Sequence, residues 1–141
     1  MNSYQGGCLC GAIRFEITSP IRKIIYCHCS MCRKAQGSAF AANGIVEREA
    51  FRILKGGDKL STYESLPGQT KYFCSICGSP IMSRNTRRPE QVRVRLGTID
   101  SDIVEKPEAH TFYSSRASWE NYCDAELPRF DSWEPGRSNA D

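Results

Sequence analysis

The sequence predicts a mainly β protein built from small antiparallel sheets with little helix. Most apolar segments alternate with a period of two, as strands with one buried face do. Turn signals such as Gly-Gly, Pro-Gly and Asn-Thr separate these segments at short intervals. Only one short segment has the pattern of a helix. The length of 141 residues suits one domain with one core.

The predicted strands are short. In segment 12–18 (AIRFEIT), Ile13, Phe15 and Ile17 are expected to share one face. Segment 91–97 (QVRVRLG) alternates apolar residues with Arg93 and Arg95, which are expected on a solvated face. The remaining strand candidates are 23–27, 51–56, 61–65, 70–74, 79–83 and 109–113.

One helix is predicted, over residues 30–36 (SMCRKAQ), with Ser30 as its N-cap and Gly37 at its end. The single domain is expected to span residues 1–141, with a core over about 6–119. The tail, about 128–141, is the least patterned segment, and we expect it to wrap the surface.

Composition and charge restrict the function. No apolar run approaches the roughly 18 residues that span a membrane, and the N-terminus lacks the features of a signal peptide. We therefore expect a cytoplasmic protein with reduced thiols. The formal charge of +3 would become 0 with seven thiolates (−7) and two zinc ions (+4). Without a long basic run, a nucleic-acid partner is not expected.

Four of the eight cysteines form two pairs, each followed by glycine: Cys8-Leu-Cys10-Gly11 and Cys74-Ser-Ile-Cys77-Gly78. Two residues between thiolates let both reach one tetrahedral ion, and the glycine permits the tight turn. Two such pairs make a closed four-cysteine site, which is typical of structural zinc. A disulfide scaffold is the alternative, but it fits a reducing compartment poorly.

Three further cysteines, Cys27, Cys29 and Cys32, lie within six positions. Three protein ligands with one open position are typical of a catalytic zinc site. A thioredoxin-like dithiol and an iron–sulfur cluster are alternatives with less support, because no βαβ pattern and no fourth cysteine is present locally. His28 is either a further ligand or points outward. Cys123 is expected to be a small buried hydrophobe.

These motifs resemble the glutathione-dependent formaldehyde-activating enzyme family, which includes centromere protein V. The resemblance rests on GGCLCGAIRFEI, YCHCSMCRKAQGSAF and KYFCSICGSPI, and extends to HTFYSSRASW, which contains His110 and Trp119. It implies a β-tent fold organised around zinc. It also implies a structural zinc on Cys8, Cys10, Cys74 and Cys77, and a catalytic zinc on Cys27, Cys29 and Cys32.

The resemblance implies a carbon–sulfur lyase that acts on glutathione adducts, such as S-(hydroxymethyl)glutathione formed from glutathione and formaldehyde. The alternative is a zinc-organised binding module without catalysis, with a nucleic acid or a protein as partner. Arg33 and Lys34 adjoin Cys32 and are expected to hold the carboxylates of glutathione. Other candidate cations are Arg84, Arg87, Arg88, Arg93 and Arg95, and candidate aromatic walls are Tyr26, Phe40, Trp119 and Trp133.

Overall fold

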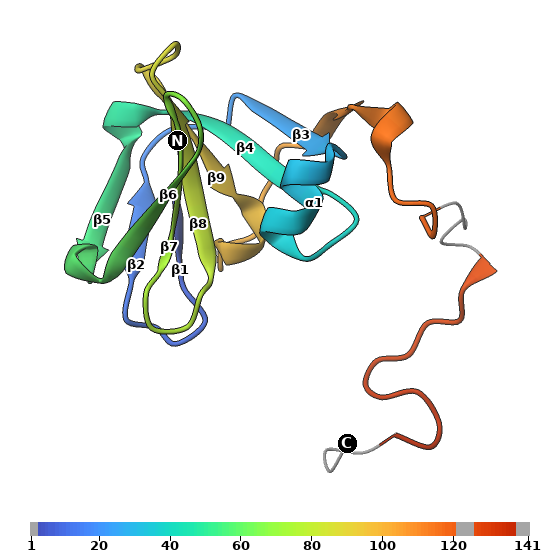
Figure 1. Ribbon diagram of the computed structural model, residues 1–141. Helices are drawn as coiled ribbons and strands as arrows, with labels where there is room; N and C mark the ends of the chain where they lie inside the picture. The colour runs from blue at the N-terminus through green and yellow to red at the C-terminus, as the bar shows by residue number, and fades with distance from the viewer. Residues whose placement is uncertain (1–2, 121–125, 138–141) are drawn as a thin grey trace.

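A computed structural model of the protein describes residues 3–120 and 126–137. These residues form ten strands, one α-helix and four short 3₁₀ helices (Figure 1). The helix is α1 (Ser30–Gln36). The strands are β1 (Tyr4–Gly7), β2 (Arg14–Ile17), β3 (Lys23–Cys27), β4 (Ala41–Glu47), β5 (Phe51–Lys55), β6 (Leu60–Leu66), β7 (Gln69–Cys74), β8 (Pro80–Asn85), β9 (Gln91–Arg95) and β10 (Pro107–Thr111).

The strands form two sheets, so the prediction of a mainly β fold with little helix is confirmed. One sheet has the order β1-β2-β5, and the other has the order β10-β3-β4-β9-β8-β7-β6. All pairs are antiparallel except β10 with β3, which are parallel. This pair corrects the purely antiparallel expectation. Strands far apart in the chain can pair in either direction, and hydrophobic periodicity carries no information about direction.

The core lies between the two sheets. Ile13, Phe15 and Ile17 are fully buried, as their alternation predicts. They pack in one cluster with side chains of β3, β4, β8 and β9. On β9 the prediction is only half right: Val92 and Val94 are buried, but Arg95 is also buried, with 4% of its surface exposed. The arginine face of β9 is therefore covered at Arg95 rather than solvated there.

Helix α1 is predicted with the correct bounds but the wrong N-cap. The cap is Cys29, whose Sγ accepts a hydrogen bond from the backbone N–H of Cys32 at 3.3 Å, whereas Ser30 is the first helical residue. The sulfur thus occupies the place of a capping oxygen. Gly37 ends the helix as predicted, with φ 61° and its N–H bonded to the carbonyl of Arg33.

Two strands were not predicted, β1 and β4. Both contain glycines where neighbouring groups approach the backbone closely. A Cβ on Gly6 would lie 2.2 Å from the Thr98 carbonyl oxygen, and one on Gly44 would lie 2.8 Å from the Leu96 side chain. Asn-Gly in β4 is a common turn signal, but here packing against Leu96 and Ile21 keeps the backbone extended.

The described part of the tail does not behave as expected. Residues 126–137 are exposed throughout and lie apart from the sheets in Figure 1, so they do not wrap the surface. The prediction for Cys123 concerns a residue outside the described ranges. Among the described helices, none has the length and apolar character needed to cross a membrane.

Candidate metal centres and the adjoining cavity

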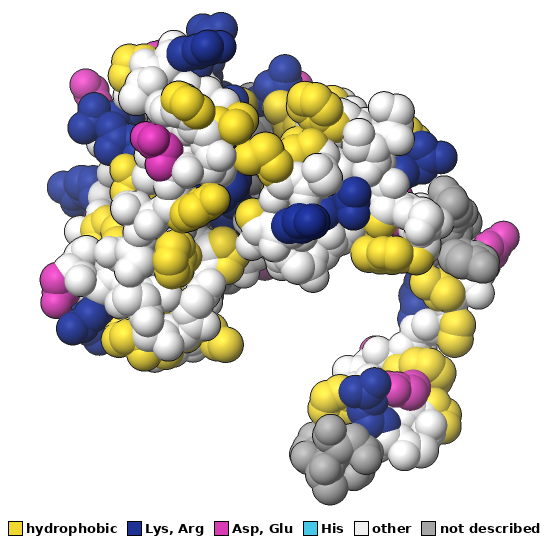
Figure 2. All heavy atoms as spheres, viewed as in Figure 1, with side chains coloured by type: hydrophobic (Ala, Val, Ile, Leu, Met, Phe, Trp, Pro, Cys, Tyr) yellow, Lys and Arg dark blue, Asp and Glu magenta, His cyan; other side chains and the backbone are white. Residues whose placement is uncertain are grey.

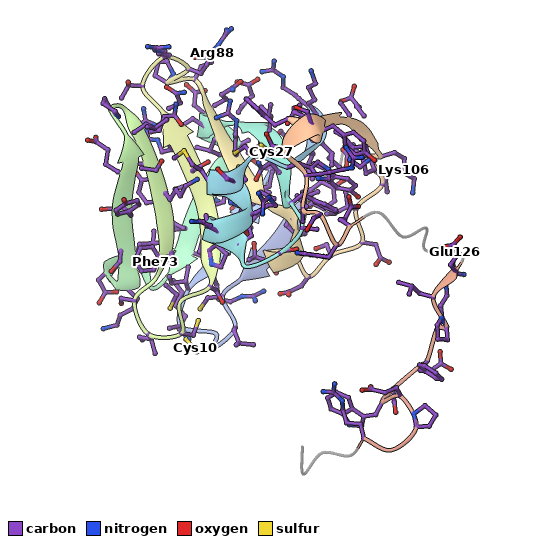
Figure 3. All side chains as sticks on the ribbon, turned by 45° about the vertical axis from the view of Figure 1, so that its right-hand side comes forward. Cys10, Cys27, Phe73, Arg88, Lys106 and Glu126 are labelled. Atoms are coloured by element: carbon purple, nitrogen blue, oxygen red, sulfur yellow. The ribbon has the colours of Figure 1, made fainter. Side chains whose placement is uncertain are left out.

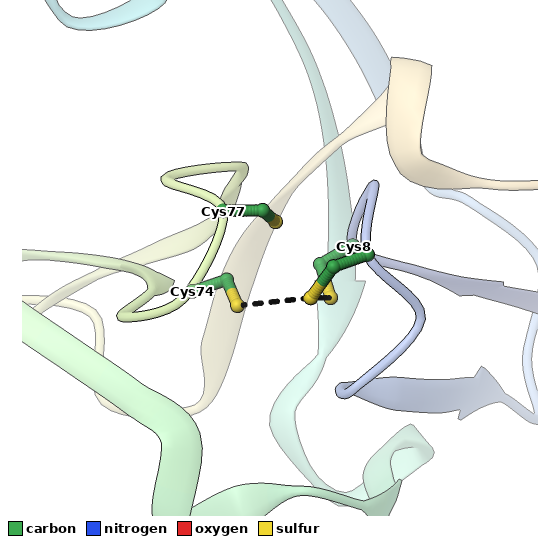
Figure 4. A group of neighbouring side chains, drawn as sticks. Cys8, Cys74 and Cys77 are labelled. Atoms are coloured by element: carbon green, nitrogen blue, oxygen red, sulfur yellow. Dashed lines mark hydrogen bonds between the residues drawn. The ribbon is translucent and has the colours of Figure 1, made fainter.

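The two predicted cysteine pairs converge on one point. The Sγ atoms of Cys8, Cys10, Cys74 and Cys77 all lie within 4.8 Å of one another (Figure 4). The Cys8–Cys10 and Cys10–Cys74 sulfurs are 3.6 and 3.8 Å apart. A tetrahedral zinc ion with bonds of about 2.3 Å to sulfur holds its sulfurs about 3.8 Å apart. The donor set and its spacing therefore fit zinc.

Both pairs close with a tight turn that ends in glycine. Gly11 and Gly78 have φ of 80° and 78°, and each donates its N–H to the carbonyl of the first cysteine of its pair. No atom lies within 4 Å of a Cβ built on either glycine, so the positive φ, and not crowding, requires glycine here. Hydrogen bonds with Ser79 lower the pKa of Cys77 to about 5, which favours the thiolate that a metal needs.

The second cluster is formed by one short segment. Cys27 is the last residue of β3, Cys29 caps α1 and Cys32 lies in the first turn of that helix. Their three Sγ atoms lie within 4.8 Å of one another. Burial and the neighbouring thiols of Cys27 and Cys29 raise the pKa of Cys32 to about 12. A metal cation would remove this resistance to ionisation, so three crowded thiols suit a metal.

The two clusters are well separated. Figure 3 shows Cys10 at the lower edge of the sheets and Cys27 well away from it, beside α1. The four-cysteine cluster joins the loop after β1 to the turn between β7 and β8. The three-cysteine cluster depends on no such distant connection, although β10 lies beside it: Thr111 pairs with Cys27 and accepts the N–H of His28 at 2.9 Å.

A cavity of about 600 Å³ opens beside Cys27, Cys29 and Cys32, and all three line it. Four cations line it as well, and it has no Asp or Glu among its lining residues in the described part of the chain. These cations are Lys71, Arg84, Arg93 and Arg95. None of them forms an ion pair with a described carboxylate. The cavity therefore favours an anion beside the thiols.

Arg95 is the most unusual of these cations. Its side chain is almost fully buried, Nη1 donates to Asn43 Oδ1, and Nε has no partner among the described residues. Burial lowers the pKa of Arg95, while the nearby thiols of Cys32 and Cys27 oppose that shift. A buried guanidinium with a free donor and no carboxylate is energetically costly unless a ligand pairs with it.

Arg33 and Lys34 lie elsewhere. Arg33 directs Nε to the carbonyl of His28 at 3.3 Å and does not line the cavity beside the thiols. Lys34 lines a second, neighbouring cavity. Arg88 lies at the far end of the β8–β9 turn (Figure 3), and neither it nor Arg87 reaches either cavity. The assignment of substrate carboxylates to Arg33 and Lys34 stays a prediction.

His28 is neither a member of the sulfur cluster nor directed to solvent. It is fully buried, its Nε2 lies 2.8 Å from His110 Nδ1, and its ring packs against Phe40 and Tyr113. Tyr26 stacks on Phe40 in the same aromatic group. None of these rings lines either cavity. The other two candidate wall residues, Trp119 and Trp133, are 63% and 49% exposed and also lie outside both cavities.

Sequence reasoning missed Lys71, Asn43 and Phe112 as residues of the cavity. Lys71 lies in a predicted strand, but no motif separates it from an ordinary surface lysine. Phe112 follows β10 and is the only described non-glycine residue with a positive φ, 53°. That backbone conformation costs free energy and is found most often at functional positions. The sequence placed Phe112 inside a predicted strand, 109–113, so no signal pointed to this conformation.

The chain is similar to several known proteins. The family model described as glutathione-dependent formaldehyde-activating enzyme matches residues 3–115. A Halomonas elongata protein named "Putative glutathione-dependent formaldehyde-activating enzyme" is 33% identical over 124 residues, which cover 82% of this chain and 78% of the relative. A Schizosaccharomyces pombe protein named an uncharacterized lyase is 28% identical, covering 79% of this chain and 87% of the relative.

A solved structure supports the fold. The crystal structure of a Rhodobacter sphaeroides protein superimposes with a TM-score of 0.62 at 22% identity, covering 76% of this chain and 99% of that one. At this identity the likeness concerns the fold alone.

Proposed function

Because the chain belongs to the glutathione-dependent formaldehyde-activating enzyme family, we propose that it is a zinc-dependent carbon–sulfur lyase that acts on glutathione adducts. The observation that carries the proposal is the meeting of two features in one cavity. Three thiols face it from Cys27, Cys29 and Cys32, and four cations that pair with no described carboxylate line it. Glutathione offers a thiol for the first feature and two carboxylates for the second.

Zinc bound by the three thiolates would act as a Lewis acid that favours the thiolate form of an incoming thiol. Residues that line the cavity would position that thiol. The free donor of Arg95, together with Lys71, favours an anionic peptide in the cavity, where charge-assisted hydrogen bonds are strong. Holding the thiol beside a carbonyl carbon supplies proximity for the formation or cleavage of the carbon–sulfur bond.

In this proposal the other cluster is structural. Its four thiolates would leave no position open, and Cys8 and Cys74 are buried in the core. A zinc ion there would join chain segments that are far apart in sequence, so its binding free energy would contribute to folding.

A binding module for nucleic acid is the alternative, and the position of the cations argues against it. Lys71, Arg84, Arg93 and Arg95 line a cavity, and Arg95 is almost fully buried. A duplex backbone is bound by cations on an accessible surface. Binding of nucleic acid that weakens steeply with salt, in a protein without turnover, would favour the module.

Calorimetry in two buffers of different ionisation enthalpy tests the proposal. Glutathione should release a proton on binding, because its thiol ionises, whereas S-methylglutathione should release none from sulfur. Cys29→Ala should remove the difference. Equal affinities and equal proton counts for the two peptides would show that the thiol plays no part, and would reduce the protein to a peptide-binding module.

A further inference from the structure

A second cavity lies beside the first. Its volume is about 420 Å³, and its lining is largely apolar, including Ala35 of α1, Tyr72 and Phe73 of β7, and Met82 of β8. Figure 2 shows hydrophobic side chains bordering a hollow between strands β6–β8 and the helix. Formaldehyde has only two heavy atoms and needs no such space, since cavities of about 300–1,000 Å³ hold drug-sized molecules.

The two cavities adjoin and share four lining residues. Met31, Ser65, Lys71 and Arg95 line both of them. The N-terminal end of α1, with Cys29 and Cys32, lines the cavity beside the thiols, while the end of α1 lines the apolar one. A group bonded to a sulfur atom near Cys32 therefore has an apolar compartment within its reach, past Met31.

The charges that line the two cavities indicate what kind of ligand they bind. Lys34, Lys71 and Arg95 are the cations of the apolar cavity, which has no described carboxylate in its lining. Lys71 and Arg95 lie at the junction, and the remaining cations, Arg84 and Arg93, lie in the cavity beside the thiols. The complementary ligand is anionic at one end and apolar at the other, with sulfur between.

We propose that the apolar cavity binds the organic group of the aldehyde, so that the substrates of this protein are glutathione adducts of large apolar aldehydes. This inference rests on the proposed function and names its substrate class. The reaction is RSH + R′CHO ⇌ RS–CH(OH)R′. The carbon–sulfur bond forms, the carbonyl π bond breaks, and the thiol proton ends on the new hydroxyl. The addition is redox-neutral, so the step needs no external oxidant or reductant.

Binding of stable adduct analogues tests the proposal. S-methyl- and S-hexylglutathione differ by five methylenes, and each buried methylene is worth about fourfold in affinity. Even with partial burial, S-hexylglutathione should bind at least about tenfold more tightly to the zinc-loaded protein. Its binding should also shift the backbone amide resonances of residues 34–36 and 72–73, whereas S-methylglutathione should leave them in place.

Two variants place the effect in the apolar cavity. Ala35 is exposed on α1 and lines this cavity, so Ala35→Trp should fill the space and reduce the hexyl-to-methyl affinity ratio to about one. Ala109 is exposed on β10 and lines neither cavity, so Ala109→Trp is the matched control and should keep the ratio.

The outcomes separate this proposal from the proposed function. Suppose that the unmodified protein binds glutathione but its hexyl-to-methyl affinity ratio is near one. This result would overturn the proposal of a large apolar aldehyde and leave the proposed glutathione lyase standing. Binding of S-hexylglutathione with the predicted amide shifts, but no binding of glutathione or S-methylglutathione, would keep the apolar compartment and overturn the proposed function. Binding of none of the three peptides would overturn both.

Discussion

The two cysteine clusters use the same side chain in opposite settings. The four-cysteine cluster draws on two loops that are more than sixty residues apart, and two of its thiols are buried. The three-cysteine cluster comes from one segment, Cys27–Cys32, and all its thiols line a cavity. A metal ion would have a closed coordination sphere in the first arrangement and one open side in the second. The proposed function therefore assigns the first cluster to holding the fold and the second to binding a ligand.

The largest expected difference is in stability. Cys77→Ala should unfold the protein, because it breaks a site whose metal contributes on the order of 10 kcal/mol in small zinc domains. Cys29→Ala removes a ligand from a local site and should leave a folded, inactive protein. Circular dichroism and thermal melts of the two variants test this pair. Equal damage from both would contradict the division of roles.

The next largest expected difference is in how readily each cluster loses its metal ion. The ion of the three-cysteine cluster should leave first under a graded chelator, with the sheets intact, because fewer ligands hold it and a cavity exposes it. The second ion should leave only with unfolding. Metal counting beside circular dichroism at each chelator concentration gives the order. Simultaneous loss of both ions with unfolding would refute it.

Within the open site, Arg95 should matter for ligand binding and not for folding. Arg95→Met should weaken binding of S-methylglutathione by about 1.5–3 kcal/mol, or roughly 10- to 150-fold, through loss of a charge-assisted hydrogen bond. The unfolding free energy should change little, because removal of a buried charge without an ion pair offsets the hydrogen bond that buried Asn43 loses.

Arg33→Met is the matched control for Arg95→Met. Arg33 does not line the cavity beside the thiols, so this variant should bind S-methylglutathione with nearly unchanged affinity. The comparison also decides the original assignment of carboxylates to Arg33. If Arg33→Met weakened binding and Arg95→Met did not, the cations of the cavity would have no part in recognition.

The smallest expected effect is a pH dependence from Lys71. Burial lowers the pKa of Lys71, so in the folded protein this side chain loses its proton at a lower pH than an ordinary lysine. Affinity for an anionic peptide needs the charged form and should therefore fall as pH rises through the lowered pKa. Lys71→Arg keeps its charge and should keep its affinity.

The ratio of S-methylglutathione affinities in Lys71→Arg and the unmodified protein should thus rise several-fold between neutral pH and about pH 10. The ratio cancels the titration of the peptide itself. A constant ratio across this range would show that Lys71 does not contact the anion.

The cysteine clusters were predictable because metal geometry constrains local spacing. Cys8-x-Cys10-Gly11 and Cys74-x-x-Cys77-Gly78 each specify a turn, and the structure brings both together. Alternation likewise predicted the buried face of β2. Both signals are local in sequence, so they can be recognised without knowledge of the tertiary contacts.

The cavity was not predictable in the same way. Arg95 alternates with buried valines, a pattern that predicts a solvated residue. In the structure it bonds Asn43 of β4 and lines a cavity with Lys71 of β7 and residues of α1. The parallel pairing of β10 with β3 likewise brings Thr111 and Phe112 beside the thiols. These positions depend on long-range packing, which periodicity and spacing do not encode.

Absorption spectroscopy of the protein loaded with cobalt(II) tests the central claim most directly, because each thiolate bound to cobalt adds to the charge-transfer absorption in the near ultraviolet. We expect glutathione to increase that absorption in the unmodified protein and S-methylglutathione to leave it unchanged. In Cys29→Ala the increase should be lost, while the signal of the four-cysteine cluster remains. An unchanged absorption at saturating glutathione would contradict the claim that the three-cysteine cluster is an open site for an incoming thiol.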